Sequence, residues 1–167
     1  MTYKRIVIKL GTNLLTSGNE YLDLSVIKSL CKQISEIKSK GIQIILVSSG
    51  AVAYGRGVIK NTSDKVTKNN VAYRQMLAAI GQPKLMLTFD ECFKEHNLIV
   101  AQALLSRSDL NNRSRYLNLR TTLEKLFSVD AIPIVNENDV VAVDELSGEF
   151  FGDNDRLSAM VANSIDA

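Results

Sequence analysis

The 167-residue sequence contains few cysteines and histidines and no long apolar run, and these shortages exclude several classes of protein. Cys31 and Cys92 are too few for the disulfide framework of a small secreted domain, so we expect both to be packing residues in a reducing cytoplasm. With His96 as the single histidine, no Cys/His cluster is available for zinc. No stretch is long enough for a membrane span or a signal segment. We therefore predict a cytoplasmic protein with no membrane partner.

The sequence also has no large excess of positive or negative charge. The sequence has 20 Lys and Arg against 18 Asp and Glu, a formal charge of +2, and its basic residues form no long run. This balance argues against nucleic acid as a partner. The length and the 46% hydrophobic content fit a single globular domain with a sizeable core.

Short apolar runs alternate with helical patterns along the chain, which predicts βαβ units and a parallel sheet covered by helices. The runs are continuous rather than alternating, as in strands buried on both faces. The predicted strands cover residues 5–12, 42–48, 98–105 and 131–135, with a short further strand at 140–143. The predicted helices cover residues 24–40, 51–57, 71–80, 83–96, 113–127 and 152–164, with a break at 81–83 and a polar, mobile loop at 60–70.

Polar residues gather where four of these segments begin or end. Ligands of open α/β sheets bind at the carboxyl ends of the strands, so these positions are candidates for a site. They are Lys9, Gly11 and Thr12 after the first strand, residues 48–51 after the second, 136–139 after the fourth, and 152–155 at the start of the last helix.

Lys9 interrupts an apolar run, and a buried ammonium group needs a partner. One interpretation is a structural salt bridge or an edge strand. The other is a phosphate contact, because the following Gly11 allows close approach of backbone and ligand. We expect the Lys9 amine to lie within reach of Gly50 and Asp155.

The other polar segments also allow more than one interpretation. Residues 48–51 form either an anion-binding turn at a helix N-terminus or a plain tight turn, and they lack the Gly-Lys-Ser/Thr ending of a P-loop. Residues 136–139 and 152–155 offer carboxylates and amides that could orient an amino acid. They could equally be acidic turns with a helix cap, or contribute to a Mg²⁺ site.

Taken together, the four segments resemble the glutamate 5-kinases of the amino-acid kinase superfamily. They read KLGT at 9–12, VSSGAVA at 47–53, NEND at 136–139 and GDND at 152–155, with further similar stretches at 75–82, 102–109 and 132–139. The resemblance implies an amino-acid kinase fold. It also implies ATP-dependent phosphorylation of the L-glutamate side-chain carboxylate to γ-glutamyl phosphate, the first step of proline biosynthesis.

The resemblance also implies roles for individual residues. Lys9 would contact the transferring phosphoryl group and, with Gly11, the nucleotide, while Asp155 would orient the catalytic lysine. The residues implied to bind substrate are Ser49, Gly50, Ala51, Asn136, Asp139 and Asn154. ATP and Mg²⁺ are the implied cofactors, with no protein metal ligand assigned. Proline is the implied feedback inhibitor, and a homo-oligomer is expected.

The family's nucleotide-binding half, with its Ser/Thr-Asp pair and its glycine-rich segment carrying a second lysine, is missing from residues 1–167. We therefore interpret these residues as the amino-terminal, glutamate-binding part of the domain, weak or inactive alone. We also expect an open sheet edge and an uncovered apolar face at Leu157, Met160 and Val161, which would favour self-association. The alternatives are another amino-acid kinase, acting on acetylglutamate, aspartate, carbamate or uridylate, or a non-catalytic substrate-binding or assembly fragment.

Overall fold

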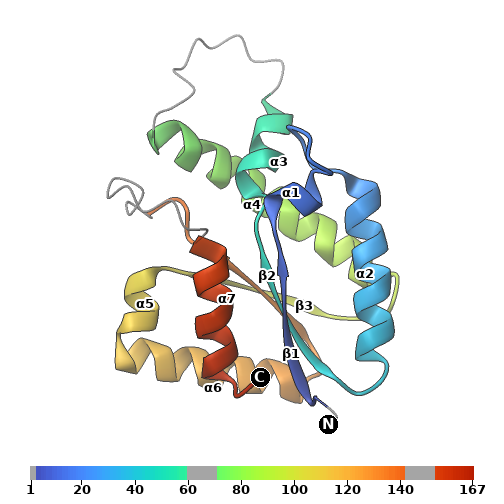
Figure 1. The fold of residues 1–167 in the computed structure, drawn as a ribbon, viewed down its shortest axis with the longest axis vertical. Helices are drawn as coiled ribbons and strands as arrows, with labels where there is room; N and C mark the ends of the chain where they lie inside the picture. The colour runs from blue at the N-terminus through green and yellow to red at the C-terminus, as the bar shows by residue number, and fades with distance from the viewer. Residues whose placement is uncertain (1–2, 60–70, 142–152) are drawn as a thin grey trace.

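The computed structural model describes residues 3–59, 71–141 and 153–167, which form helices around a central sheet (Figure 1). The sheet is 4-stranded, in the order β1-β2-β4-β3, and every pairing is parallel. This confirms the predicted α/β fold with a parallel open sheet. The strands are β1 (Arg5–Leu10), β2 (Gln43–Ser48), β3 (Val100–Leu105) and β4 (Ile132–Glu137).

The helices cover both faces of the sheet. One face carries α1 (Thr12–Leu15), α2 (Leu24–Lys38), α3 (Ala51–Val58) and α4 (Val71–Lys94), and the other carries α5 (Arg107–Asn111), α6 (Arg113–Ser128) and α7 (Asp153–Ser164). Strand β2 shows why its apolar run is continuous. Ile44 and Leu46 pack toward α2 and α4, while Ile45 and Val47 pack toward α6 and α7.

Helix α2 illustrates how the local sequence places these elements. Ile27, Cys31 and Ile34 recur at helical spacing and are buried against the sheet. The Asp23 side chain accepts a hydrogen bond from the Ser25 amide at 3.0 Å, which caps the N-terminus. After the helix ends, Gly41 has a φ of +81°, a conformation that glycine adopts without strain.

Several sequence-based predictions of structure are wrong. Helix α4 runs unbroken through residues 81–83, with Pro83 inside it and Leu77, Ala78 and Leu85 buried on its inner face. Packing of that face outweighs the hydrogen bond that Pro83 cannot make. Strand β1 is not buried on both faces, because it lies at an edge of the described sheet and its side chains are largely half-buried. Val140 and Val141 lie in a turn, not in a strand.

The last helix is also better covered than the sequence suggested. Leu157, Val161 and Ile165 are buried in the cluster that α7 shares with β2, β4 and α6, and Met160 packs against it. The apolar face of α7 is therefore occupied by the chain itself. The predicted loop at residues 60–70, together with 142–143 of the predicted short strand, lies outside the described residues.

Candidate functional site

The carboxyl ends of β1, β2 and β4 meet at one edge of the sheet, where α3 and α7 begin. The parallel register places Leu10 beside Ser48 and Val47 beside Val135. The Ser49 amide extends the pairing by donating to the Leu10 carbonyl at 2.9 Å. Three of the predicted polar segments therefore follow adjacent strands and come together in space.

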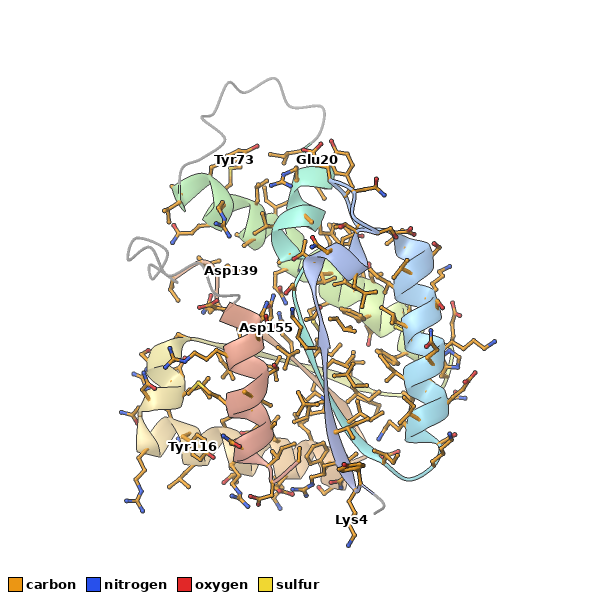
Figure 2. The ribbon with its side chains drawn as sticks, viewed as in Figure 1. Lys4, Glu20, Tyr73, Tyr116, Asp139 and Asp155 are labelled. Atoms are coloured by element: carbon orange, nitrogen blue, oxygen red, sulfur yellow. The ribbon has the colours of Figure 1, made fainter. Side chains whose placement is uncertain are left out.

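Lys9 and Asp155 form an ion pair at this edge. The Lys9 Nζ lies 2.8 Å from Asp155 Oδ1, and the side chains are 36% and 69% exposed. Figure 2 shows Asp155 at the start of α7, over the end of the sheet. The predicted pairing of Lys9 with Asp155 is confirmed, whereas the predicted burial of Lys9 is wrong. Both the edge-strand interpretation and a role toward a ligand fit this geometry, and the approach of Lys9 to Gly50 stays a prediction.

The Lys9 side chain lies close to the backbone of Gly11. A Cβ atom at this position would lie 3.1 Å from Lys9 Nζ and 3.6 Å from its Cε, so the Lys9 side chain folds closely over the Gly11 backbone. An alanine at this position would require the end of the flexible Lys9 side chain to shift by a few tenths of an ångström. Glycine leaves room for the Lys9 amine close to the backbone.

The turn from β2 into α3 requires glycine at residue 50. Gly50 has a φ of 104° and precedes the helix as its N-cap, and no described side chain caps α3. A Cβ there would lie 3.2 Å from the side chains of both Leu15 and Leu22. Helix N-termini carry partial positive charge, so this turn is suited to face an anion. Ala51, the first residue of α3, is buried.

Ser49, Asn154 and Asn136 form a hydrogen-bonded network beside the ion pair. Asn154 Nδ2 donates to Ser49 Oγ at 2.7 Å and lies 3.4 Å from Asn136 Oδ1. Asn136 is 2% exposed, and its Oδ1 also accepts from the Glu137 amide at 2.9 Å. The structure thus brings together three of the predicted substrate-binding residues, from the ends of two strands and the start of α7.

The network continues to Gln82 on α4, a residue for which no functional role was predicted from the sequence. Asn136 Nδ2 donates to Gln82 Oε1 at 2.9 Å. Gln82 ended one of the stretches that resembled the family, but a polar side chain on a helix does not by itself indicate a site. Only the fold shows that it faces Asn136.

The network leaves one acceptor without a partner. Asn154 Oδ1 is buried and receives no hydrogen bond from the described residues. A buried polar atom in this state is costly and usually has a functional explanation or a missing partner. Its chemistry suits a donor such as an ammonium group.

Asp139 lies in the turn after β4 and is half-buried (Figure 2). The segment is held by the Asn138 amide, which donates to the Leu105 carbonyl at 2.8 Å. Gly152 lies outside the described residues, so the GDND motif is represented here by Asn154 and Asp155.

A hollow lies on the other side of α7, between α5 and the ends of β3 and β4. Its lining is mainly apolar and consists of Leu105, Ser106, Leu110, Glu137, Arg156, Leu157 and Met160. None of the sequence-predicted site residues lines it.

Two features are absent from residues 3–59, 71–141 and 153–167. No cluster of three or more His, Cys, Asp or Glu side chains there could hold a metal ion. No helix in the same ranges is sufficiently long and apolar to cross a membrane.

Comparison with known proteins identifies the class to which this fold and site belong. Residues 4–167 match the amino acid kinase family, and the chain belongs to that family. A UMP kinase from Ureaplasma parvum has a similar fold, with a TM-score of 0.58 over 100% of this chain and 66% of that one, at 19% sequence identity.

Several curated relatives are named glutamate 5-kinase. The chain is 53% identical over 165 residues to the glutamate 5-kinase of Dehalococcoides mccartyi strain CBDB1, covering 99% of this chain and 43% of that protein. It is 44% identical over 164 residues to the glutamate 5-kinase of Pelobacter propionicus, covering 98% and 42% respectively. The predicted resemblance is therefore confirmed, and the chain spans less than half the length of these relatives.

Proposed function

We propose that this chain is the acidic-substrate half of a kinase that transfers the γ-phosphoryl group of ATP to the side-chain carboxylate of L-glutamate. The product is γ-glutamyl phosphate, the first intermediate on the route to proline. The observation that carries the proposal is the Lys9–Asp155 pair beside the Ser49–Asn154–Asn136 network, at the sheet end where α/β proteins bind ligands. The identity to glutamate 5-kinases supports the choice of substrate.

The reaction needs charge stabilisation more than covalent chemistry from the protein. A γ-carboxylate oxygen of glutamate attacks the γ-phosphorus, a new O–P bond forms, and the bond to the β,γ-bridging oxygen breaks as ADP leaves. Lys9 supplies positive charge to the transferring group, and Asp155 holds the Lys9 amine over Gly11. These are the catalytic roles that we assign to Lys9 and Asp155.

The substrate is positioned by the surrounding donors and acceptors. Asn154 Oδ1 accepts from the ammonium group of glutamate, which satisfies the unpaired buried acceptor. Asp139 supplies a second acceptor for the same group. The turn at Ser49, Gly50 and Ala51 faces a carboxylate of the substrate. Asn136 orients Asn154 through the hydrogen bond between their side chains.

ATP and Mg²⁺ complete the proposed reaction. Mg²⁺ in kinase sites is held largely by phosphate oxygens, with few protein carboxylates. Lys9 and Gly11 would meet the end of the nucleotide that carries the γ-phosphate. Feedback inhibition by proline, assembly into a homo-oligomer and a cytoplasmic location belong to the same proposal.

A panel of acids tests the proposed activity in the longest form of the protein that its gene encodes. Acyl phosphates react with hydroxylamine to give hydroxamates, which can be quantified. L-Glutamate with MgATP is expected to give hydroxamate, whereas N-acetylglutamate, aspartate, carbamate and UMP are expected to give no ATP turnover above background. Turnover with one of these four and none with glutamate would contradict the proposal.

A further inference from the structure

We propose that Gln82 is a positioning residue for the acidic substrate, acting through Asn136 on Asn154. The inference rests on the proposed glutamate site and deepens it. Gln82 Oε1 accepts from Asn136 Nδ2 at 2.9 Å, and Asn136 Oδ1 in turn lies 3.4 Å from Asn154 Nδ2. Gln82 itself is the far end of this chain of amides and is separated from the substrate by two side chains.

A backbone hydrogen bond determines how the side-chain amides of this network are oriented. The Glu137 amide can only donate, and it donates to Asn136 Oδ1 at 2.9 Å. The other end of the Asn136 amide is then its NH₂ group, which needs an acceptor, and Gln82 Oε1 supplies it. Because Asn136 presents its oxygen to Asn154, Asn154 must present its NH₂ group there. Asn154 Oδ1 is consequently left facing away from the network, as the acceptor available to a ligand.

Gln82 lies on a part of α4 whose backbone is tightly packed. The preceding residue, Gly81, packs so closely on α3 that a Cβ would lie 1.8 Å from the Ala51 carbonyl oxygen. Leu77, Ala78 and Leu85 of the same helix are buried in the core. These contacts fix the backbone of α4 at Gln82 relative to the turn that begins α3.

A purely structural network of buried amides would be expected to satisfy all its members. In this one, Gln82 Oε1 and both ends of the Asn136 amide have partners, and the network ends on a buried acceptor without a described partner. The unpaired acceptor belongs to Asn154, which directly precedes Asp155, the ion-pair partner of Lys9. The direction of the network thus points from α4 toward the site.

The test compares L-glutamate affinity, measured by calorimetry, in matched variants of the longest gene-encoded form. Gln82→Leu replaces the amide with an apolar side chain and so removes the acceptor, and it is expected to weaken glutamate binding about tenfold, equivalent to about 1.4 kcal/mol. Gln82→Glu keeps an acceptor and is expected to stay within about threefold at 0.15 M salt. Glu91→Gln, at an exposed position of the same helix, is the control and is expected to change nothing.

Two further readouts separate positioning from general stability. In an Asn136→Ala background, Gln82→Leu is expected to cause no additional loss, because its path to Asn154 is already cut. The side-chain amide resonances of Asn136 and Asn154, seen by NMR after asparagine-selective ¹⁵N labelling, are expected to shift in Gln82→Leu and not in the control. If Gln82→Leu fails to fold by circular dichroism, Gln82→Met replaces it.

The outcomes distinguish this inference from the proposed function. Absence of glutamate binding by the parent protein would refute the proposed function, and the amide resonances would still decide whether Gln82 orients Asn136 and Asn154. Unchanged resonances in the Gln82 variant, or an equal loss of affinity with and without Asn136, would overturn the role of Gln82.

Discussion

Lys9 contributes little to the stability of the fold in this structure. Its pair with Asp155 is short, but 36% of the lysine side chain and 69% of the aspartate side chain stay exposed. Exposed ion pairs usually stabilise a protein by about 0–1 kcal/mol because solvent screens them. An effect of Lys9 on activity would therefore report on chemistry rather than on folding.

Replacing Lys9 tests this separation. Lys9→Met keeps the aliphatic stem and is expected to lower kcat by about 10²–10³-fold, since it removes the charge that we propose to act on the transferring phosphoryl group. The glutamate KM is expected to stay within about threefold. Steady-state kinetics of the longest gene-encoded form measure both, with the exposed Lys4→Met as control. Equal losses in kcat and in glutamate affinity would instead indicate a ground-state contact.

At the scale of elements, the contact between α3 and α4 is made through glycines. A Cβ at Gly55 would lie 2.0 Å from the Leu77 carbonyl oxygen, and one at Gly81 would lie 1.8 Å from that of Ala51. The two helix backbones therefore touch, which fixes the start of α3 and the turn at Gly50. No rearrangement of a flexible side chain can make room, because the atoms in the way belong to the backbone.

Gly81→Ala is accordingly expected to destabilise the protein by about 3 kcal/mol, the upper range for overpacking a core. Gly57→Ala is the matched control on α3. The nearest atom to its new Cβ would be Tyr21 Cδ1 at 3.6 Å, an ordinary contact. This control is expected to be neutral or to stabilise by about 0.5–1 kcal/mol, because alanine favours the helix. Urea unfolding measures both, and similar effects of the two substitutions would contradict the close helix contact.

The sequence predicted most elements because their patterns are local. The four longer strands and the five main helical segments follow from apolar runs, helical spacing and caps. The predicted break in α4 failed because Gly81 and Pro83 indicate an interruption when considered alone, whereas the structure uses Gly81 for a helix contact. The short helices α1 and α5 were not predicted, since helices of 4 and 5 residues have too little periodicity to detect.

The site was predicted less completely, and for a different reason. Lys9 and the turn at residues 48–51 stand out as polar residues at strand ends, but the roles of Asn136 and Asn154 came from resemblance. Ser49 and Asn154 are 105 residues apart in the chain and meet at 2.7 Å. Gln82 and Asn136 are 54 apart. Such pairings depend on the order of the strands, which no local pattern contains.

At the scale of the whole molecule, the reactivity of the two cysteine thiols indicates whether the apolar layer between α2, α4 and the sheet is closed to solvent. Cys31 and Cys92 are free, 1% and 5% exposed, and belong to the same apolar cluster. Their predicted packing role is confirmed. Burial raises the pKa of both the Cys31 and the Cys92 thiol, and the thiolate is the reactive form.

The rate of thiol labelling is therefore expected to be limited by the opening of the folded structure. With Ellman's reagent at pH 8, the native protein is expected to react only as fast as it opens, and to give two thiols at full extent in denaturant. Ser29→Cys, at an exposed position of α2, is the control and is expected to add one thiol that reacts at once. Rapid native labelling of Cys31 or Cys92 would show that this layer is not closed.

The central claim is that L-glutamate binds where β2 and β4 end and α7 begins. The most direct measurement is a glutamate titration followed by NMR, with ¹⁵N labels in the asparagine side chains of the longest gene-encoded form. The account predicts saturable shifts of the Asn154 and Asn136 amides, and loss of the Asn136 shift in Asn154→Ala. Saturable glutamate binding that leaves both amides unchanged would contradict it.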